Sequence, residues 1–194
     1  MALSVGNRNI KTAVFISGKG SNLKSLIKFS KLKKSPITIK MIISNNIKSK
    51  GLVFGKIYKI NKKVFNFDKQ EKAEKNILSI LKKKNINLIC LAGFMKILSK
   101  NFIKSFKGKI INIHPSLLPK YKGLNTHLRA IKNKDKFAGC TVHFVTAKLD
   151  SGKIILQKKI KIRTKDNVSS LKKRVLKEEH KLYPASIMKI FPNL

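Results

Sequence analysis

The stretch TAVFISGKGSNLKSLIKFSKLKKSPITIKMIIS, residues 12–44, decides the fold. Residues 12–17 and 37–44 are apolar runs of strand length. The segment between them, residues 22–32, is helical by its spacing of apolar residues, which are Leu23, Leu26, Ile27 and Leu32. The order strand, helix, strand predicts a βαβ unit with two parallel strands.

The same alternation continues along the chain. A helix is expected at 68–84 and a final helix from about Val168, with Leu171, Val175 and Leu182 on one stripe. Further strands are expected at 86–94, 109–114, 139–146 and 153–162. We therefore predict an α/β fold with a mostly parallel central sheet and helices on both faces, while the last strands can run in either direction.

Length and composition restrict the class of protein. The 194 residues suit one domain, 1–194, in which residues 1–11 form a flexible N-terminus. No apolar run is long enough to cross a membrane and no signal peptide is visible, so we expect a cytoplasmic protein. Cys90 and Cys140 lie in apolar segments without metal-ligand spacing, which favours reduced, buried thiols and no metal site.

The net charge of +37, from 45 basic and 8 acidic residues, has two interpretations. Lysine and arginine bind nucleic-acid phosphates, but recognition modules concentrate them on one face or in a tail. Here lysines occur along the whole chain beside many Ile and Asn residues, a bias that A+T-rich codons produce. We expect no specific nucleic-acid partner, and a polyanion-binding surface stays open as the alternative.

Polar residues that close the strands are the first candidates for a site, since ligands of such sheets bind beyond the carboxyl ends of the strands. The sequence SGKGSN, residues 17–22, links the first strand to its helix, and two glycines there suit a phosphate cradle or a simple tight turn. Leu23 stands where a dinucleotide fingerprint needs glycine, and Gly20 follows Lys19 where a P-loop needs Ser or Thr. A small phosphate ester is therefore favoured over NAD or ATP.

The sequence INIHPSLLP, residues 111–119, ends another buried strand with polar groups. Asn112 and His114 lie two residues apart and point to the same side of an extended strand. Pro115 then stops the strand. Asp150, in a turn between two later strands, could reach His114 and fix its tautomer. A structural histidine and an ordinary Asp-Ser-Gly turn are the alternatives.

Four segments together resemble one enzyme family: ISGKGSNLKSLI, LAGFMKILS, INIHPSLLPKYKGLNTHLRAI and TVHFVTAKLDSGKIILQKKI. They are similar to the phosphoribosylglycinamide formyltransferases, the folate-dependent enzymes of purine synthesis, from about residue 12 to 191. The resemblance implies a Rossmann-like formyltransferase fold. It also implies transfer of a formyl group from 10-formyltetrahydrofolate, as co-substrate, to the amine of glycinamide ribonucleotide. A monomer or weak homodimer without metal or membrane partner is expected.

The resemblance also implies residue roles. The expected catalytic residues are Asn112, His114 and Asp150, and the expected binders of the ribonucleotide are Gly20, Ser21, Asn22 and Glu179. Residues expected to contact the folate are Met95, Lys96, Ile97, Leu98, Asn112, Thr146, Ala147, Lys148, Leu149, Asp150 and the position of Gln70. No chemistry is assigned to His127, His143 or His180.

One position departs from the family pattern. Gln70 stands where the family usually has an arginine that helps to bind folate, and a neutral amide cannot replace a charge-assisted contact with a carboxylate. Lys69 or Lys72 could substitute.

Other functions are the alternatives to this enzyme. A formyltransferase acting on methionyl-tRNA or a folate deformylase would need a further domain. A nucleic-acid-binding protein and an enzyme that has lost activity are the remaining alternatives.

Overall fold

The computed structural model describes residues 9–192 and is built around one sheet with the strand order β3-β2-β1-β4-β5-β6-β7. Its strands are β1 Ile10–Ile16, β2 Ile37–Ser44, β3 Asn61–Val64, β4 Leu88–Leu91, β5 Lys109–His114, β6 Phe137–Phe144 and β7 Ile154–Lys161. Its helices are α1 Ser21–Ser30, η1 Lys50–Leu52, α2 Val53–Ile57, α3 Gln70–Lys83, α4 Lys100–Ser105, α5 Thr126–Lys132 and α6 Val168–Ile190.

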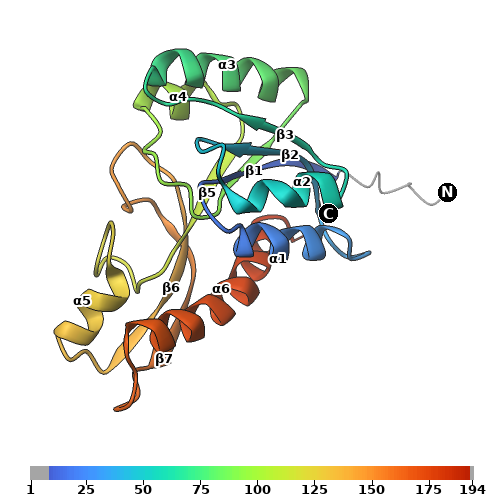
Figure 1. Cartoon of the computed structure of the whole chain (residues 1–194). Coiled ribbons are helices and arrows are strands. Elements are labelled where there is room, and N and C mark those ends of the chain that lie inside the picture. The colour runs from blue at the N-terminus through green and yellow to red at the C-terminus, as the bar shows by residue number, and fades with distance from the viewer. Residues whose placement is uncertain (1–8, 193–194) are drawn as a thin grey trace.

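Strand direction divides the sheet in two. The five strands from β3 to β5 are parallel, whereas β6 and β7 pair antiparallel. In Figure 1, α3 and α4 lie on one side of the sheet, and α1, α2 and α6 lie on the other. The predicted α/β class, with a mostly parallel sheet covered on both faces, is confirmed.

Each face of the sheet has its own hydrophobic core. On one face Leu23, Leu26 and Ile27 of α1 pack with Leu171 and Val175 of α6 against the strands. On the other, the core is formed by α3 and α4, with Ile77, Leu81 and Phe102 as its most buried helical residues. The apolar stripes predicted for α1 and α6 are thus the stripes that fix these helices over the sheet.

Some predicted boundaries were wrong. Leu32 lies beyond the end of α1 and is 51% exposed. The strand expected at 86–94 spans only Leu88–Leu91. The apolar residues Ala92 and Phe94 follow it in an irregular segment and pack against the two cores. Residues 1–8 of the expected flexible N-terminus lie outside the described part, but Ile10 and Lys11 already belong to β1. Sequence patterns also missed β3, α2, α4 and α5, which are short.

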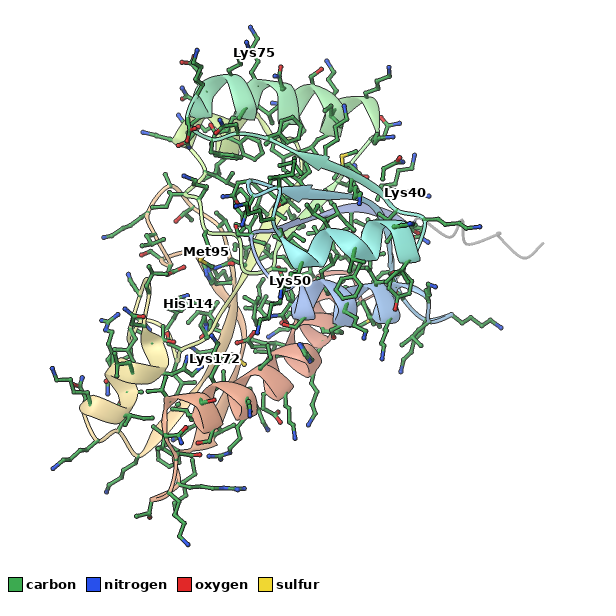
Figure 2. The ribbon with its side chains drawn as sticks, viewed as in Figure 1. Lys40, Lys50, Lys75, Met95, His114 and Lys172 are labelled. Atoms are coloured by element: carbon green, nitrogen blue, oxygen red, sulfur yellow. The ribbon has the colours of Figure 1, made fainter. Side chains whose placement is uncertain are left out.

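Three further observations concern hydropathy, the cysteines and the lysines. No helix between residues 9 and 192 is both long and apolar enough to cross a membrane. Burial raises the pKa of both cysteine thiols, that of Cys140 to about 12, so both are protonated at neutral pH. Lysines project from separate elements, as Lys40 of β2 and Lys75 of α3 illustrate in Figure 2.

Candidate active site

The carboxyl ends of β1, β4 and β5 lie side by side, because β4 pairs with both of the other strands. Ser17 follows β1 and joins it to the segment after β4: its N–H donates to the Gly93 carbonyl at 3.1 Å, and its hydroxyl accepts from the Met95 N–H at 2.8 Å. Figure 2 labels Met95, which follows β4, and His114, which ends β5. The polar segments after these strands therefore meet at one edge of the sheet.

His114 and Asp150 are in direct contact at this edge. His114 Nδ1 lies 3.3 Å from Asp150 Oδ2, and the two side chains are 7% exposed. Asp150 reaches this place through a left-handed backbone conformation, with φ of 45°, and its Oδ2 also accepts from the Gly123 N–H at 2.9 Å. The expected approach of Asp150 to His114 is confirmed as a contact.

Asn112 joins the cluster through a histidine that sequence reasoning did not assign. His143 of β6 lies directly opposite Asn112 of β5 in the antiparallel ladder, and its Nε2 is 3.3 Å from Asn112 Nδ2. The same Nε2 is 3.6 Å from Asp150 Oδ1. His143 Nδ1 lies 2.8 Å from the Phe144 carbonyl. Because a carbonyl only accepts, Nδ1 carries a proton. A neutral His143 then accepts from the Asn112 amide at Nε2, whereas a His143 protonated at both nitrogens donates from Nε2 to Asp150.

The two ring nitrogens of His114 face two acceptors. Nε2 lies 2.8 Å from the Tyr121 carbonyl, and Nδ1 faces the Asp150 carboxylate. Neutral imidazole has one N–H and satisfies one of these contacts, whereas imidazolium satisfies both. These two contacts therefore favour the protonated ring over the neutral one.

Burial acts against that charge. Burial lowers the pKa of His114 below 6.5, and the Tyr121 carbonyl and Asp150 offset only part of this effect. Burial alone would raise the pKa of Asp150. The contacts with His143, the Gly123 N–H and His114 outweigh burial, so this pKa lies below its usual value. At neutral pH the pair thus rests as a neutral imidazole beside a carboxylate.

The loop before α1 has the features of an anion site. Gly20 precedes α1 with φ of 73°, and no side chain caps this helix end, so the N–H groups of its first turn are open to a ligand. A Cβ at Gly20 would come within 2.8 Å of Gly51 Cα, so both the backbone angle and the packing require glycine.

The ribonucleotide residues expected from the sequence also meet here. Asn22 Nδ2 donates to Glu179 Oε2 at 2.6 Å, which joins α1 to α6. Asn22 Oδ1 is buried and has no hydrogen-bond partner within residues 9–192. Burial raises the pKa of Glu179, and the Asn22 amide and Lys172 lower it by less. A carboxylate and a free acceptor thus lie beside the open helix end.

The segments expected to hold folate are mostly exposed. Met95 and Ile97 are 62% and 60% exposed, but Leu98 is only 4% exposed and packs in the core beneath α3 and α4. The side chains from Thr146 to Leu149 are exposed, whereas that of Asp150 is buried. Gln70 donates to the Ile97 carbonyl at 2.8 Å and so touches the first of these segments.

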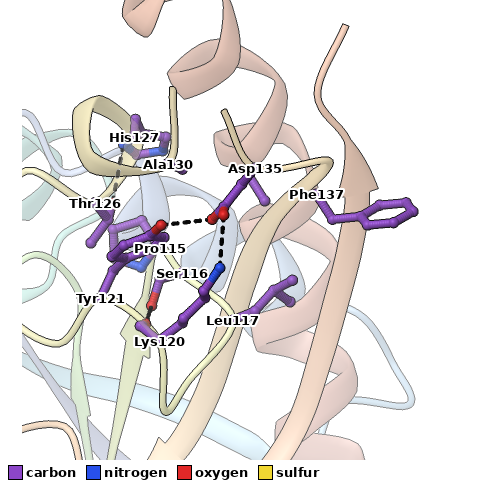
Figure 3. Close-up of a pocket in the computed structure, with 11 residues that line it drawn as sticks. Pro115, Ser116, Leu117, Lys120, Tyr121, Thr126, His127, Ala130, Asp135 and Phe137 are labelled. Atoms are coloured by element: carbon purple, nitrogen blue, oxygen red, sulfur yellow. Dashed lines mark hydrogen bonds and ion pairs between the residues drawn. The ribbon is translucent and has the colours of Figure 1, made fainter. Parts of the chain in front are cut away.

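A small cavity lies behind the cluster, next to Pro115 and His127 (Figure 3). Its volume of about 20 Å³ suits one water molecule. Asp135 closes one side, accepting from Lys120 Nζ and from the Tyr121 hydroxyl at 2.7 Å each. Neither this cavity nor a hollow of about 420 Å³ between β3 and α3 includes the catalytic candidates, so the polar contacts locate the site.

The pKa of His127 leads us to expect that the free energy of unfolding depends on pH. Burial is the main cause that lowers the pKa of His127 from 6.5 to about 4, with Lys172 and His114 adding to it. Between these values the unfolded chain binds more protons, so the free energy of unfolding should fall as pH falls from 6.5 to 4. Denaturant titrations across this range should show a smaller fall for His127→Gln. The same slope in both proteins would contradict this role, because the other histidines are unchanged.

Among residues 9–192, no three His, Cys, Asp or Glu side chains gather in a way that could hold a metal ion. The contacts of the cluster run instead to amide, carbonyl and carboxylate groups.

Fold and site together define the class: an α/β enzyme with amide, imidazole and carboxylate groups at the strand ends of a mostly parallel sheet. The sequence profile of the Formyl transferase family matches residues 10–187, and the chain belongs to this family.

Relatives and solved structures agree with this assignment. A phosphoribosylglycinamide formyltransferase of Haemophilus influenzae is 43% identical over 180 residues, which are 91% of this chain and 85% of that protein. The human trifunctional purine biosynthetic protein adenosine-3 is 39% identical over 95% of this chain, which spans only 18% of that protein. The crystal structure of phosphoribosylglycinamide formyltransferase from Brucella melitensis superposes with a TM-score of 0.89 at 39% identity, covering 96% of this chain and 97% of that one.

The site also contains groups that no sequence pattern indicated. His143 enters through the strand register of β5 and β6, which places it opposite Asn112 and which local sequence does not reveal. Tyr121 and Gly123 contribute backbone groups, which any residue carries. Ser17 was part of the predicted loop, but its bond to Met95 depends on the order of β1 and β4.

Proposed function

We propose that this formyltransferase moves the formyl group of 10-formyltetrahydrofolate to the amine of glycinamide ribonucleotide, with Asn112, His114 and Asp150 as catalytic residues. The observation that carries the proposal is the contact of His114 with Asp150 beside Asn112, at the strand ends. Relatives that match over most of their length are phosphoribosylglycinamide formyltransferases, which supports the choice of substrates.

Attack of the amine on the formyl carbon produces a tetrahedral species with a negative oxygen and a positive nitrogen. The Asn112 amide has two N–H groups, one of which points to His143. The second is free to donate to the oxyanion, and a preorganised donor of this kind lowers the barrier by roughly 3 to 4 kcal/mol. His143 fixes the direction of the amide.

His114 then handles the proton. Nδ1 is held by Asp150, so Nε2 is the atom that serves the substrate, and its contact with the Tyr121 carbonyl must be exchanged first. The ring can donate to the oxyanion or pass a proton from the attacking amine to the folate nitrogen that leaves. Asp150 favours the imidazolium in both cases.

The loop of Gly20, Ser21 and Asn22 binds the phosphate of the ribonucleotide in this proposal, and Glu179 also contacts the ribonucleotide. Placing a carboxylate at the helix start with Ser21→Asp should repel the phosphate. We expect KM for the ribonucleotide to rise at least about tenfold, the effect of losing about 1.4 kcal/mol of binding, while KM for the folate stays the same. Steady-state kinetics with each substrate varied in turn would show this. A rise in both constants would contradict the assignment of the loop.

The acceptor distinguishes this function from that of related enzymes. The purified protein should be given 10-formyltetrahydrofolate with glycinamide ribonucleotide, with initiator methionyl-tRNA, or with neither. Formyl transfer only in the first mixture supports the proposal. Release of free formate in the third mixture at the same rate would mean hydrolysis, and formylated tRNA in the second would mean a different acceptor.

The wider setting follows from the same proposal. The protonated, buried thiols suit a reducing compartment, so we assign the reaction to the cytoplasm. We also propose that the enzyme is a monomer or a weak homodimer. We assign no nucleic-acid partner to the +37 charge. A selected polyanion surface would instead retain DNA or RNA at moderate ionic strength, with affinity falling as a power of the salt concentration.

A further inference from the structure

We propose that Glu74 and Gln70 of α3 are positioning residues of the co-substrate pocket, which fix the backbone of the segment Met95–Leu98. This inference rests on the proposed function, in which that segment holds the folate. It adds a role for two residues that touch neither the catalytic cluster nor the ribonucleotide loop.

The segment needs to be held from outside. It follows β4 without helix or strand structure until α4 begins, and Met95 and Ile97 are largely exposed. At its start, Ser17 accepts from the Met95 N–H. At its end, α3 supplies the contacts. The shape of the segment therefore depends on side chains from two other elements.

Glu74 is the centre of the contacts from α3. Its Oε1 accepts from Gln70 Nε2 and from the Ser99 N–H, at 2.8 Å each, and its Oε2 accepts from the Ser99 hydroxyl at 2.5 Å. Ser99 in turn caps α4, since its hydroxyl accepts from the Phe102 N–H at 3.0 Å. One carboxylate thus fixes the residue at which the segment ends and α4 begins.

Gln70 completes the arrangement. The two hydrogens of its amide serve Glu74 and the Ile97 carbonyl, both at 2.8 Å. Both donors are thus used within the protein, so Gln70 supports the segment and offers no N–H to the folate. Gln70 therefore holds the backbone of Ile97 in place relative to α3.

The charge of Glu74 supports a specific role. The side chain is 5% exposed, and none of the ion pairs formed within residues 9–192 includes it. A buried carboxylate without a cation is costly, and donors from neutral groups must offset that cost.

Two variants and a matched control test the proposal. Glu74→Gln turns an N–H group toward the donors of Ser99, and Gln70→Ala removes the bond to Ile97. Glu71→Gln changes an exposed acid of the same helix. In both test variants we expect KM for 10-formyltetrahydrofolate to rise at least about tenfold, the effect of losing about 1.4 kcal/mol of binding when the segment is displaced. KM for the ribonucleotide and kcat should match the Glu71→Gln control.

Amide hydrogen exchange provides a second reading that does not depend on turnover. The amides of residues 95–98 should exchange faster in Glu74→Gln and Gln70→Ala than in the control. Unchanged exchange there, or an equal rise in both KM values, would overturn the positioning role. If the wild-type protein transferred no formyl group, the proposed function would fail. The exchange result alone would then decide whether Glu74 and Gln70 position the segment Met95–Leu98.

Discussion

His114→Ala should reduce kcat/KM for formyl transfer by a factor of about 100 or more, within the usual range for loss of a general acid or base. The variant removes the imidazole that lies 3.3 Å from Asp150 Oδ2 and that carries the proton in the proposed mechanism. The carboxylate of Asp150 would remain buried, but without an imidazole to stabilise. Steady-state rates with both substrates at saturation, together with kcat/KM for each, measure the loss.

His180→Ala is the matched control for this variant. His180 lies on α6, is partly buried, and has an Nε2 without a partner in the described residues. Its removal should leave the rate unchanged. Thermal unfolding of both variants separates loss of catalysis from loss of folding. A His114→Ala protein that is folded and as active as the control would exclude His114 from the chemistry.

Asn112→Ala should lower kcat by a factor of about 100 to 1,000, the range found when a single oxyanion donor is removed. The effect should fall on kcat more than on KM, since the charge that the amide stabilises develops only in the transition state. Asn112→Ala also frees His143 Nε2 from its donor, so a small further shift in the position of Asp150 is expected. Pre-steady-state measurement of the transfer step reports the loss directly.

The control is Asn87→Ala, an exposed amide just before β4 at the opposite end of the sheet. It should have wild-type kcat. If Asn112→Ala instead raised KM for the folate at constant kcat, the amide would bind the ground state, and the oxyanion role would be wrong.

Much of the fold follows from apolar periodicity alone. The βαβ unit, α3, β5 and α6 have enough buried residues to fix their type, and strands of continuous apolar residues belong in a parallel sheet. β3 could not be predicted, because its residues Asn61–Val64 are all exposed at a sheet edge. Leu32 was assigned to a helix by its spacing, but the pattern does not reveal where a helix ends.

The candidate site divides in the same way. Asn112, His114 and Asp150 were marked as candidates because polar groups at strand ends are costly without partners, and their contacts agree with that reasoning. The roles given to the folate and ribonucleotide residues came from resemblance and stay predictions. Strand register, loop course and helix packing determine the contacts of His143, Tyr121 and Glu74, respectively. Local sequence does not reveal any of these three features.

The central claim is that His114 and Asp150 act as one unit in formyl transfer. Rates of transfer to glycinamide ribonucleotide should be measured for the wild type, His114→Ala, Asp150→Asn and the double variant. We expect the wild type to be active and the double variant to be about as slow as His114→Ala alone, since residues that act as a unit are not additive. An inactive wild type, or a double loss equal to the product of the single losses, would contradict the account.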